Sequence, residues 1–306
     1  MNNEPVTDEL KCKPIAPRLS PEGILMPLED DFCDIVKKAR TGQGLSVADV
    51  ARTTGLPAGD LMVLERGGRS PTKAEVRTIA TALGLRADPL THIALDGWVP
   101  APTPKSVTGV ETVFGDIGGY EVKGYVVHDS GEAVLIDTGY NAAVMLETLG
   151  KMGLRLTGVC LTHGHVDHAG GLDEILQHWH VPVYLGEADA TLLSWRPPNK
   201  LFISPDDGRT ITVGRFAVRC MTTPGHTPGG ICYRVEGSGH PICFVGDTLF
   251  AGSIGRANPP SLYQIHLESV RQRVLRLPEP TVLFPGHGPA TTISEEWAQN
   301  PFAGEA

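Results

Sequence analysis

Long apolar runs are missing from this chain of 306 residues. No stretch approaches the roughly 20 apolar residues that cross a bilayer, so we expect no membrane-spanning helix. The first residues are polar and acidic rather than basic and apolar, which is untypical of a secretory signal, and we expect a cytoplasmic protein.

An excess of positive charge is missing as well. The formal net charge of −9 does not favour binding of the whole molecule to nucleic acid or to an anionic membrane.

Closely spaced cysteine pairs are also absent. None of the six cysteines has C-x-x-C spacing, and four of them lie within apolar, strand-like runs. We expect buried, reduced thiols rather than disulfides, as is usual in the cytosol. The six are Cys12, Cys33, Cys160, Cys220, Cys232 and Cys243.

What the chain does contain is a dense group of metal-binding side chains. Three imidazoles and one carboxylate lie within six residues, in His163-Gly164-His165-Val166-Asp167-His168. This segment follows the apolar residues 158–161, so it should lie at the end of a strand. Imidazole suits zinc, iron and copper, and an added carboxylate favours a hydrolytic or oxygen-activating centre over a closed structural site. Chance clustering could explain one loop histidine but not this arrangement.

Three later segments each offer one more ligand. His226, Asp247 and His287 each follow a glycine at or near the end of an apolar run. Glycine lets the backbone turn sharply, so the next side chain can reach inward. We therefore expect four segments to contribute to one site, a pattern that core packing does not generate.

From about residue 110 to 302 the chain resembles the glyoxalase II-like group of metallo-β-lactamase-fold hydrolases. Besides the histidine motif, the resemblance rests on Leu135-Ile136-Asp137-Thr138-Gly139, Gly252-Ser253-Ile254-Gly255-Arg256 and Pro285-Gly286-His287-Gly288-Pro289-Ala290-Thr291-Thr292. It implies an α/β fold, an αββα sandwich with metals at one edge between two sheets.

The same resemblance implies two metal sites and seven ligands. These are His163, His165 and His226 in one site, Asp167, His168 and His287 in the other, and Asp247 bridging both. Two cations about 3.5–4 Å apart can share a hydroxide, keep it ionised near neutral pH and polarise a scissile carbonyl. On this basis Asp167 and Asp247 are also the candidate catalytic residues. We expect two divalent ions, with zinc as the metal and iron as the alternative.

Asp247, Asp137 and Arg256 each bear on the chemistry of the site. Several β-lactamases of this fold carry cysteine where this chain has Asp247, which favours a small-molecule thioester or ester substrate over an antibiotic. Asp137 is expected to orient a ligand imidazole, the alternative being a simple turn aspartate. Arg256 is a candidate to bind a substrate carboxylate through a bidentate pair, the alternative being a salt bridge that pins its loop. The helical extension that binds glutathione in glyoxalase II enzymes is not recognisable after His287, so glutathione specificity is not expected.

Two other functions stay open. A related branch of the fold carries out persulfide dioxygenation with a single iron and the same ligand loops. That branch has Cys-Gly-Arg-Thr-Asp where this chain has Ile254-Gly255-Arg256-Ala257-Asn258, which favours hydrolysis. The other alternative is a DNA-binding regulator with a metallo-hydrolase-like sensor domain, against which the complete ligand set argues. Histidines outside the motifs, namely His128, His178, His180, His240 and His266, are expected to be structural.

The N-terminal third has a different sequence pattern, one typical of short helices. We expect a flexible tail at residues 1–31, a small all-α domain at 32–98, a proline-rich linker at 99–108 and the hydrolase domain at 109–306. Ser46 is a plausible helix N-cap and Gly55 a helix stop, with further helices over residues 60–67, 72–83 and 88–95. Gly44-Leu45-Ser46, Thr54-Gly55-Leu56, Leu64-Glu65-Arg66-Gly67 and Ala80-Thr81-Ala82-Leu83-Gly84 resemble the Cro- and lambda-repressor-like helix-turn-helix family.

This resemblance implies DNA binding through residues 32–98, which the charge of the segment favours and its recognition helix does not. Residues 32–86 hold nine bases against five acids, a charge of +4 that leaves −13 for the rest of the chain. The recognition helix, however, begins with Pro57-Ala58-Gly59-Asp60, which offers little for reading bases. Met62 and Val63 then point partly outward, and exposed apolar groups are usually covered by a partner. Homo-oligomer formation through this helix, or its docking on the hydrolase domain, is the alternative to DNA.

Overall fold

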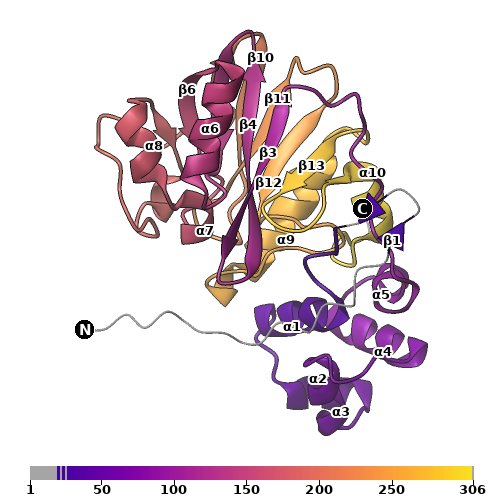
Figure 1. The fold of residues 1–306 in the computed structure, drawn as a ribbon. Helices are drawn as coiled ribbons and strands as arrows, with labels where there is room; N and C mark the ends of the chain where they lie inside the picture. Colours follow the sequence, from indigo (N-terminus) through magenta and orange to yellow (C-terminus); the bar gives the residue numbers. More distant parts are fainter. Residues whose placement is uncertain (1–18, 21–22, 25, 305–306) are drawn as a thin grey trace.

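The computed structural model describes residues 19–20, 23–24 and 26–304 (Figure 1). Most of the tail expected at residues 1–31 lies outside this range. Within it, β1 (Leu19–Ser20) pairs with β2 (Gly23–Ile24). Residues 26–31 lead into the first helix, and the Asp30 side chain among them is buried.

Two six-stranded sheets form the centre of the larger, C-terminal part of the described chain. The first has the order β3-β4-β5-β6-β7-β8, and the second has the order β14-β13-β12-β11-β10-β9. The strands of the first are β3 (Val110–Ile117), β4 (Tyr120–Asp129), β5 (Glu132–Ile136), β6 (Arg155–Cys160), β7 (Val183–Tyr184) and β8 (Phe202–Ile203). Those of the second are β9 (Thr210–Val213), β10 (Phe216–Thr222), β11 (Ile231–Glu236), β12 (Ile242–Gly246), β13 (Val282–Pro285) and β14 (Thr291–Thr292).

The sheets pack face to face because side chains alternate along each strand. In β4, Tyr125 points into the layer between the sheets, where its ring contacts Phe244 and Phe284 at centroid distances of 4.9 and 5.4 Å. Val126 points the other way, into the cluster formed with α6 (Ala142–Met152) and α8 (Leu172–His178). Burial on both faces explains why such strands are apolar almost throughout.

Helices α9 (Tyr263–Gln272) and α10 (Ile293–Gln299) cover the outer face of the second sheet. The layers therefore run helix, sheet, sheet, helix, which confirms the predicted αββα sandwich. No helix among the described residues is both long and apolar enough to cross a membrane.

The N-terminal helices form a small helical domain, which lies below the sandwich in Figure 1. They are α1 (Phe32–Gly42), α2 (Val47–Thr54), α3 (Ala58–Leu64), α4 (Lys73–Leu83), α5 (Ala87–Thr91) and η1 (His92–Asp96). Ser46 caps α2 and Gly55 ends it in the left-handed conformation, as the sequence predicts. The small all-α domain is thus present, and its helix-turn-helix identity stays a prediction. Residues 99–108, the predicted linker, contain neither helix nor strand.

This domain is docked on the hydrolase domain through α1 and α5. A Cβ on Gly42 of α1 would lie 2.3 Å from the Tyr263 ring, so the two elements are in close contact. The backbone N–H of Arg86 donates to Pro301 O at 2.9 Å. Helix α3 lies far from this contact, and Met62 and Val63 are 41% and 42% exposed. The hypothesis that the hydrolase domain covers the outer face of α3 is therefore wrong.

The cysteines among the described residues are of two kinds. Cys160, Cys220, Cys232 and Cys243 are free and buried, as expected. Cys33 is disulfide-bonded, which corrects the expectation of reduced thiols at that position. Cys12 lies outside the described residues.

Candidate metal centre

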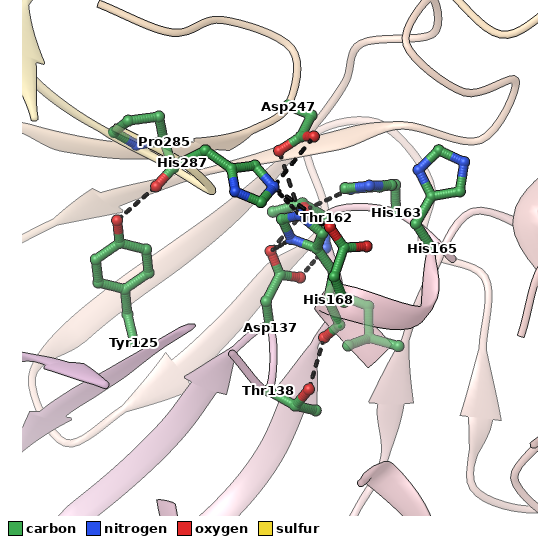
Figure 2. A network of polar contacts seen from close by, with 12 residues as sticks. Tyr125, Asp137, Thr138, Thr162, His163, His165, His168, Asp247, Pro285 and His287 are labelled. Carbon is green, nitrogen blue, oxygen red and sulfur yellow. Dashed lines mark hydrogen bonds and ion pairs between the residues drawn. The ribbon is translucent and has the colours of Figure 1, made fainter. Parts of the chain in front are cut away.

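The histidine motif begins in the turn after β6 and continues into α7 (Val166–Ala169), and Asp137 fixes that turn (Figure 2). Asp137 follows β5, the strand beside β6. Its carboxylate accepts from the backbone N–H and the hydroxyl of Thr162, both at 2.7 Å. It also accepts from His168 Nδ1 at 2.8 Å, which directs His168 Nε2 toward the centre. The predicted role of Asp137 in orienting an imidazole agrees with these contacts.

All seven predicted ligands lie at one point at the edge of the two sheets. Three ligand sets each have their donor atoms within 4.8 Å of one another. These sets are His163, His165 and His226; His163, Asp167 and His168; and His168, Asp247 and His287. Asp247 reaches both sides, with Oδ1 at 3.2 Å from His168 Nε2 and Oδ2 at 3.7 Å from His226 Nε2. That placement suits a bridging carboxylate.

Backbone carbonyls orient two further imidazoles. His226 Nδ1 donates to Arg256 O at 2.7 Å, and His287 Nδ1 donates to Glu121 O at 2.6 Å. With Nδ1 carrying the proton, each ring presents the lone pair of Nε2 to the centre. The loops after β10 and β13 are thereby held in the geometry that a metal site needs.

The donor atoms of the site are better suited to binding divalent cations than to hydrogen-bonding with one another. Among the described residues, His163 Nε2 and Asp247 Oδ1 are buried without a hydrogen-bond partner. His168 Nε2 lies 3.4 Å from His287 Nε2, and both rings already donate through Nδ1. Two lone pairs this close are favourable only around a shared positive charge. Neutral imidazole and ionised carboxylate are the ligand set that zinc or iron accepts.

The electrostatics of the site support the same interpretation. Burial lowers the pKa of His226 to about 3, which keeps this imidazole neutral. Burial opposes ionisation of Asp247, but the neighbouring His287 and His168 hold the pKa of its carboxyl well below the usual range. Burial also disfavours a charged His168, yet the Asp247, Asp167 and Asp137 carboxylates outweigh it and raise the pKa of His168. The carboxylates thus attract positive charge, which protons or metal ions can supply.

A buried aspartate that the sequence did not single out ties two ligand loops together. Asp189, at the end of η2 (Glu187–Asp189), accepts from Gly164 N–H at 3.1 Å, Thr227 Oγ1 at 2.6 Å and Gly229 N–H at 2.6 Å. Gly164 lies between His163 and His165, and Thr227 follows His226. Asp189 belongs to no motif and lies in a short irregular segment, so no pattern in the sequence could indicate it.

A cavity of about 720 Å³ opens over the centre. Arg256, the predicted substrate-binding residue, is exposed and lines it together with Asp167, His226, Asp247 and His287. Histidines expected to be structural lie elsewhere. His178 is exposed and contacts Glu174 O at 3.0 Å, and His266 is buried with Nε2 at 2.8 Å from Thr248 O. The cavity has room for a small-molecule substrate beside the metal ligands.

Comparisons with known proteins agree with this geometry. A model of the metallo-beta-lactamase superfamily matches residues 117–287. The hydroxyacylglutathione hydrolase GloC of Haemophilus influenzae is 33% identical over 189 residues, which cover 57% of this chain and 88% of that protein. The crystal structure of the BLEG-1 B3 metallo-beta-lactamase aligns with a TM-score of 0.55 at 28% identity, covering 63% of this chain and 99% of the other. The structure of TTHA1623 in a di-iron-bound form aligns with a TM-score of 0.54 at 29% identity, with the same coverage.

Proposed function

Because the chain belongs to the metallo-β-lactamase superfamily, we propose that it is a metal-dependent hydrolase of thioester or ester bonds. The observation that carries this proposal is the convergence of seven ligand side chains from four segments, with Asp247 placed to bridge the two histidine sets. A sensor domain would have no need of a bridging aspartate and both ligand sets.

We assign two divalent ions, zinc by preference, to the sites of the predicted ligands. Bound there, they would supply an activated water and polarise the carbonyl of the substrate. Asp137, Glu121 and Arg256 keep the ligand imidazoles in the required tautomer through the hydrogen bonds to their Nδ1 atoms. The Asp167 side chain is 23% exposed and lines the cavity, with Oδ2 at 3.3 Å from His287 Nε2. From this position its carboxylate can accept a hydrogen bond from the attacking water and orient it.

Two observations favour a thioester or ester as the substrate. A carboxylate at residue 247, rather than a cysteine, is the feature that separates this chain from several β-lactamases of the fold. GloC, a relative that aligns over most of its own length, is named a hydroxyacylglutathione hydrolase. Arg256 lines the cavity beside the ligands, where its guanidinium can pair with a substrate carboxylate.

The proposal is tested by thiol release from a panel of acyl thioesters with the zinc-loaded protein. We expect hydrolysis by the wild type without oxygen uptake, and loss of activity in Asp247→Asn, which keeps the shape of the side chain but removes its charge. Oxygen consumption with a persulfide and no thioester hydrolysis would replace this proposal with the dioxygenase. Equal rates for wild type and Asp247→Asn would show that the centre is not catalytic.

A further inference from the structure

The loop after β12 supports the metal ligand His226. A Cβ on Gly255 would overlap Asp247 O and lie 3.0 Å from His226 Nδ1, so this backbone lies directly against two ligands. Arg256 O accepts from His226 Nδ1 at 2.7 Å, and the N–H of Asn258 donates to His226 O at 3.0 Å. The position of this loop therefore sets the position of the His226 imidazole.

The N-terminal part of the chain holds the earlier residues of the same loop. Ser253 Oγ donates to Asp30 Oδ2 at 2.6 Å, and Lys38 Nζ of α1 donates to Ile254 O at 3.0 Å. Asp30 and Lys38 also form an ion pair, and their side chains are only 3% and 10% exposed. One buried ion pair thus binds two successive residues of the loop.

Close packing adds to these polar contacts. A Cβ on Gly252 would lie 2.8 Å from the Trp98 ring and 2.9 Å from the Ile93 side chain, so the end of the N-terminal domain lies directly on the loop. In the ligand loop after β13, a Cβ on Gly288 would lie 2.9 Å from Glu29 N. Glu29 also lines the cavity. The segment before α1 therefore lies against a second ligand loop as well.

The hydrolase domain holds the loop after β12 at different atoms. Asn300 Nδ2 donates to Ser253 O at 2.9 Å, and Glu296 accepts from the N–H of Gly252 at 3.1 Å. The Ser253 hydroxyl and the Ile254 carbonyl are bound from the N-terminal side. Without the Asp30–Lys38 pair, each of these two groups would lose a hydrogen-bond partner, and the loop would keep only the restraints from α10 and its C-terminal end.

We infer that the N-terminal domain is a positioning element of the metal centre, which acts through Asp30 and Lys38 on the loop that orients His226. This inference goes beyond the proposed function. It rests on the metal centre assigned there and not on the identity of the substrate. It also gives the N-terminal domain a role in the hydrolase that does not depend on DNA.

The test measures zinc affinity by competition with a chromophoric chelator, at a temperature where each apoprotein is folded. Asp30→Asn combined with Lys38→Met removes both charges, so that neither is left buried and unpaired. The ion that His226→Ala removes should bind at least about tenfold more weakly, as is typical when the support of a ligand imidazole is lost. A pair with a merely structural role would lower the denaturant midpoint of the apoprotein and leave the zinc affinity of the folded protein unchanged.

Arg77→Met combined with Asp88→Asn is the matched control. These residues form an ion pair of the same domain at 3.0 Å, and both side chains are more than half exposed. This variant should bind both zinc ions as the wild type does. Wild-type affinity in the folded Asp30–Lys38 variant, or a loss confined to the other ion, would overturn the inference while the proposed function stands. Zinc binding to neither site of the wild type would overturn both.

Ser253→Ala decides the question if the double variant does not fold. This change removes the hydrogen bond to Asp30 and leaves the ion pair intact. It should weaken the same zinc ion about threefold, the lower end of the range for one hydrogen bond. Unchanged affinity for that ion would overturn the inference.

Discussion

At the scale of single residues, Asp167 and His178 provide a direct contrast. Asp167 lies at the centre beside His287, and His178 is an exposed residue at the end of α8. Asp167→Ala should lower thioester hydrolysis at least about a hundredfold, because the second metal site and the orientation of the water are lost. His178→Ala should leave the rate nearly unchanged. Steady-state kinetics of both variants check this, and equal losses would mean that the ligand set is misassigned.

Glu296 leads to a prediction about pH and stability. This buried carboxyl of α10 accepts from Gly252 N–H at 3.1 Å, Thr291 Oγ1 at 2.7 Å and Asn300 Nδ2 at 2.7 Å. Burial raises the pKa of Glu296 from 4.5 to about 7. Between these values the native state binds more protons than the unfolded chain. The contribution of Glu296 to the free energy of unfolding is therefore complete below pH 4.5, and it is lost as the pH rises to about 7.

Glu296→Gln should remove this pH dependence, which amounts to about 3 kcal/mol for a shift of that size. Denaturant unfolding at about pH 5 and pH 8 measures it as the difference between wild type and variant, so that contributions from the ligand histidines cancel. Glu268→Gln, at an exposed position on α9, is the control and should keep the wild-type slope. The same slope in wild type and Glu296→Gln would contradict the assignment.

The sequence indicated the candidate metal ligands better than it indicated the residues that hold the ligand loops in place. His226, Asp247 and His287 each follow a glycine near the end of an apolar run, and the other four candidate ligands lie within one six-residue motif. Both patterns are local, so they can be recognised in the sequence alone. Asp137 was predicted because it follows a strand within a recognisable motif. Asp189 was not, because its three hydrogen bonds join segments that are distant in the sequence and depend on the packed fold.

At the scale of elements, α3 presents exposed apolar side chains on the N-terminal domain. Met62 and Val63 remain exposed, so a partner outside this chain is the remaining candidate to cover them. We expect Met62→Asp combined with Val63→Lys to shift the protein to a smaller species in light scattering, with the metal content unchanged. Sequence-specific DNA binding at physiological salt that these changes abolish, without an effect on assembly, would instead support the helix-turn-helix hypothesis.

Helix boundaries were predictable where side chains mark them. Ser46 and Gly55 define α2, and Thr72 caps α4, which runs from Lys73 to Leu83. That α1 lines the cavity could not be predicted. The sequence shows that Ile35, Val36 and Ala39 form an apolar face, but a polar face looks the same whether it borders solvent or a substrate site.

At the scale of the whole molecule, the two domains share one hydrophobic cluster. Ile35 of α1 and Leu90 of α5 belong to the same buried cluster as Leu267 of α9 and Ile293 of α10. The sequence predicted the metallo-β-lactamase sandwich and the helical character of the N-terminal part, because the two parts have different periodicities and motifs. It could not predict how the domains dock, since the contacts that orient them, such as Gly42 against Tyr263, carry no signal in either segment alone.

The central claim, a dinuclear metal hydrolase, is tested most directly by elemental analysis of the purified protein. The seven converging ligands predict about two divalent ions per chain, with zinc expected, and about one in Asp167→Ala. A single iron per chain with no zinc, together with oxygen uptake on glutathione persulfide, would contradict the account.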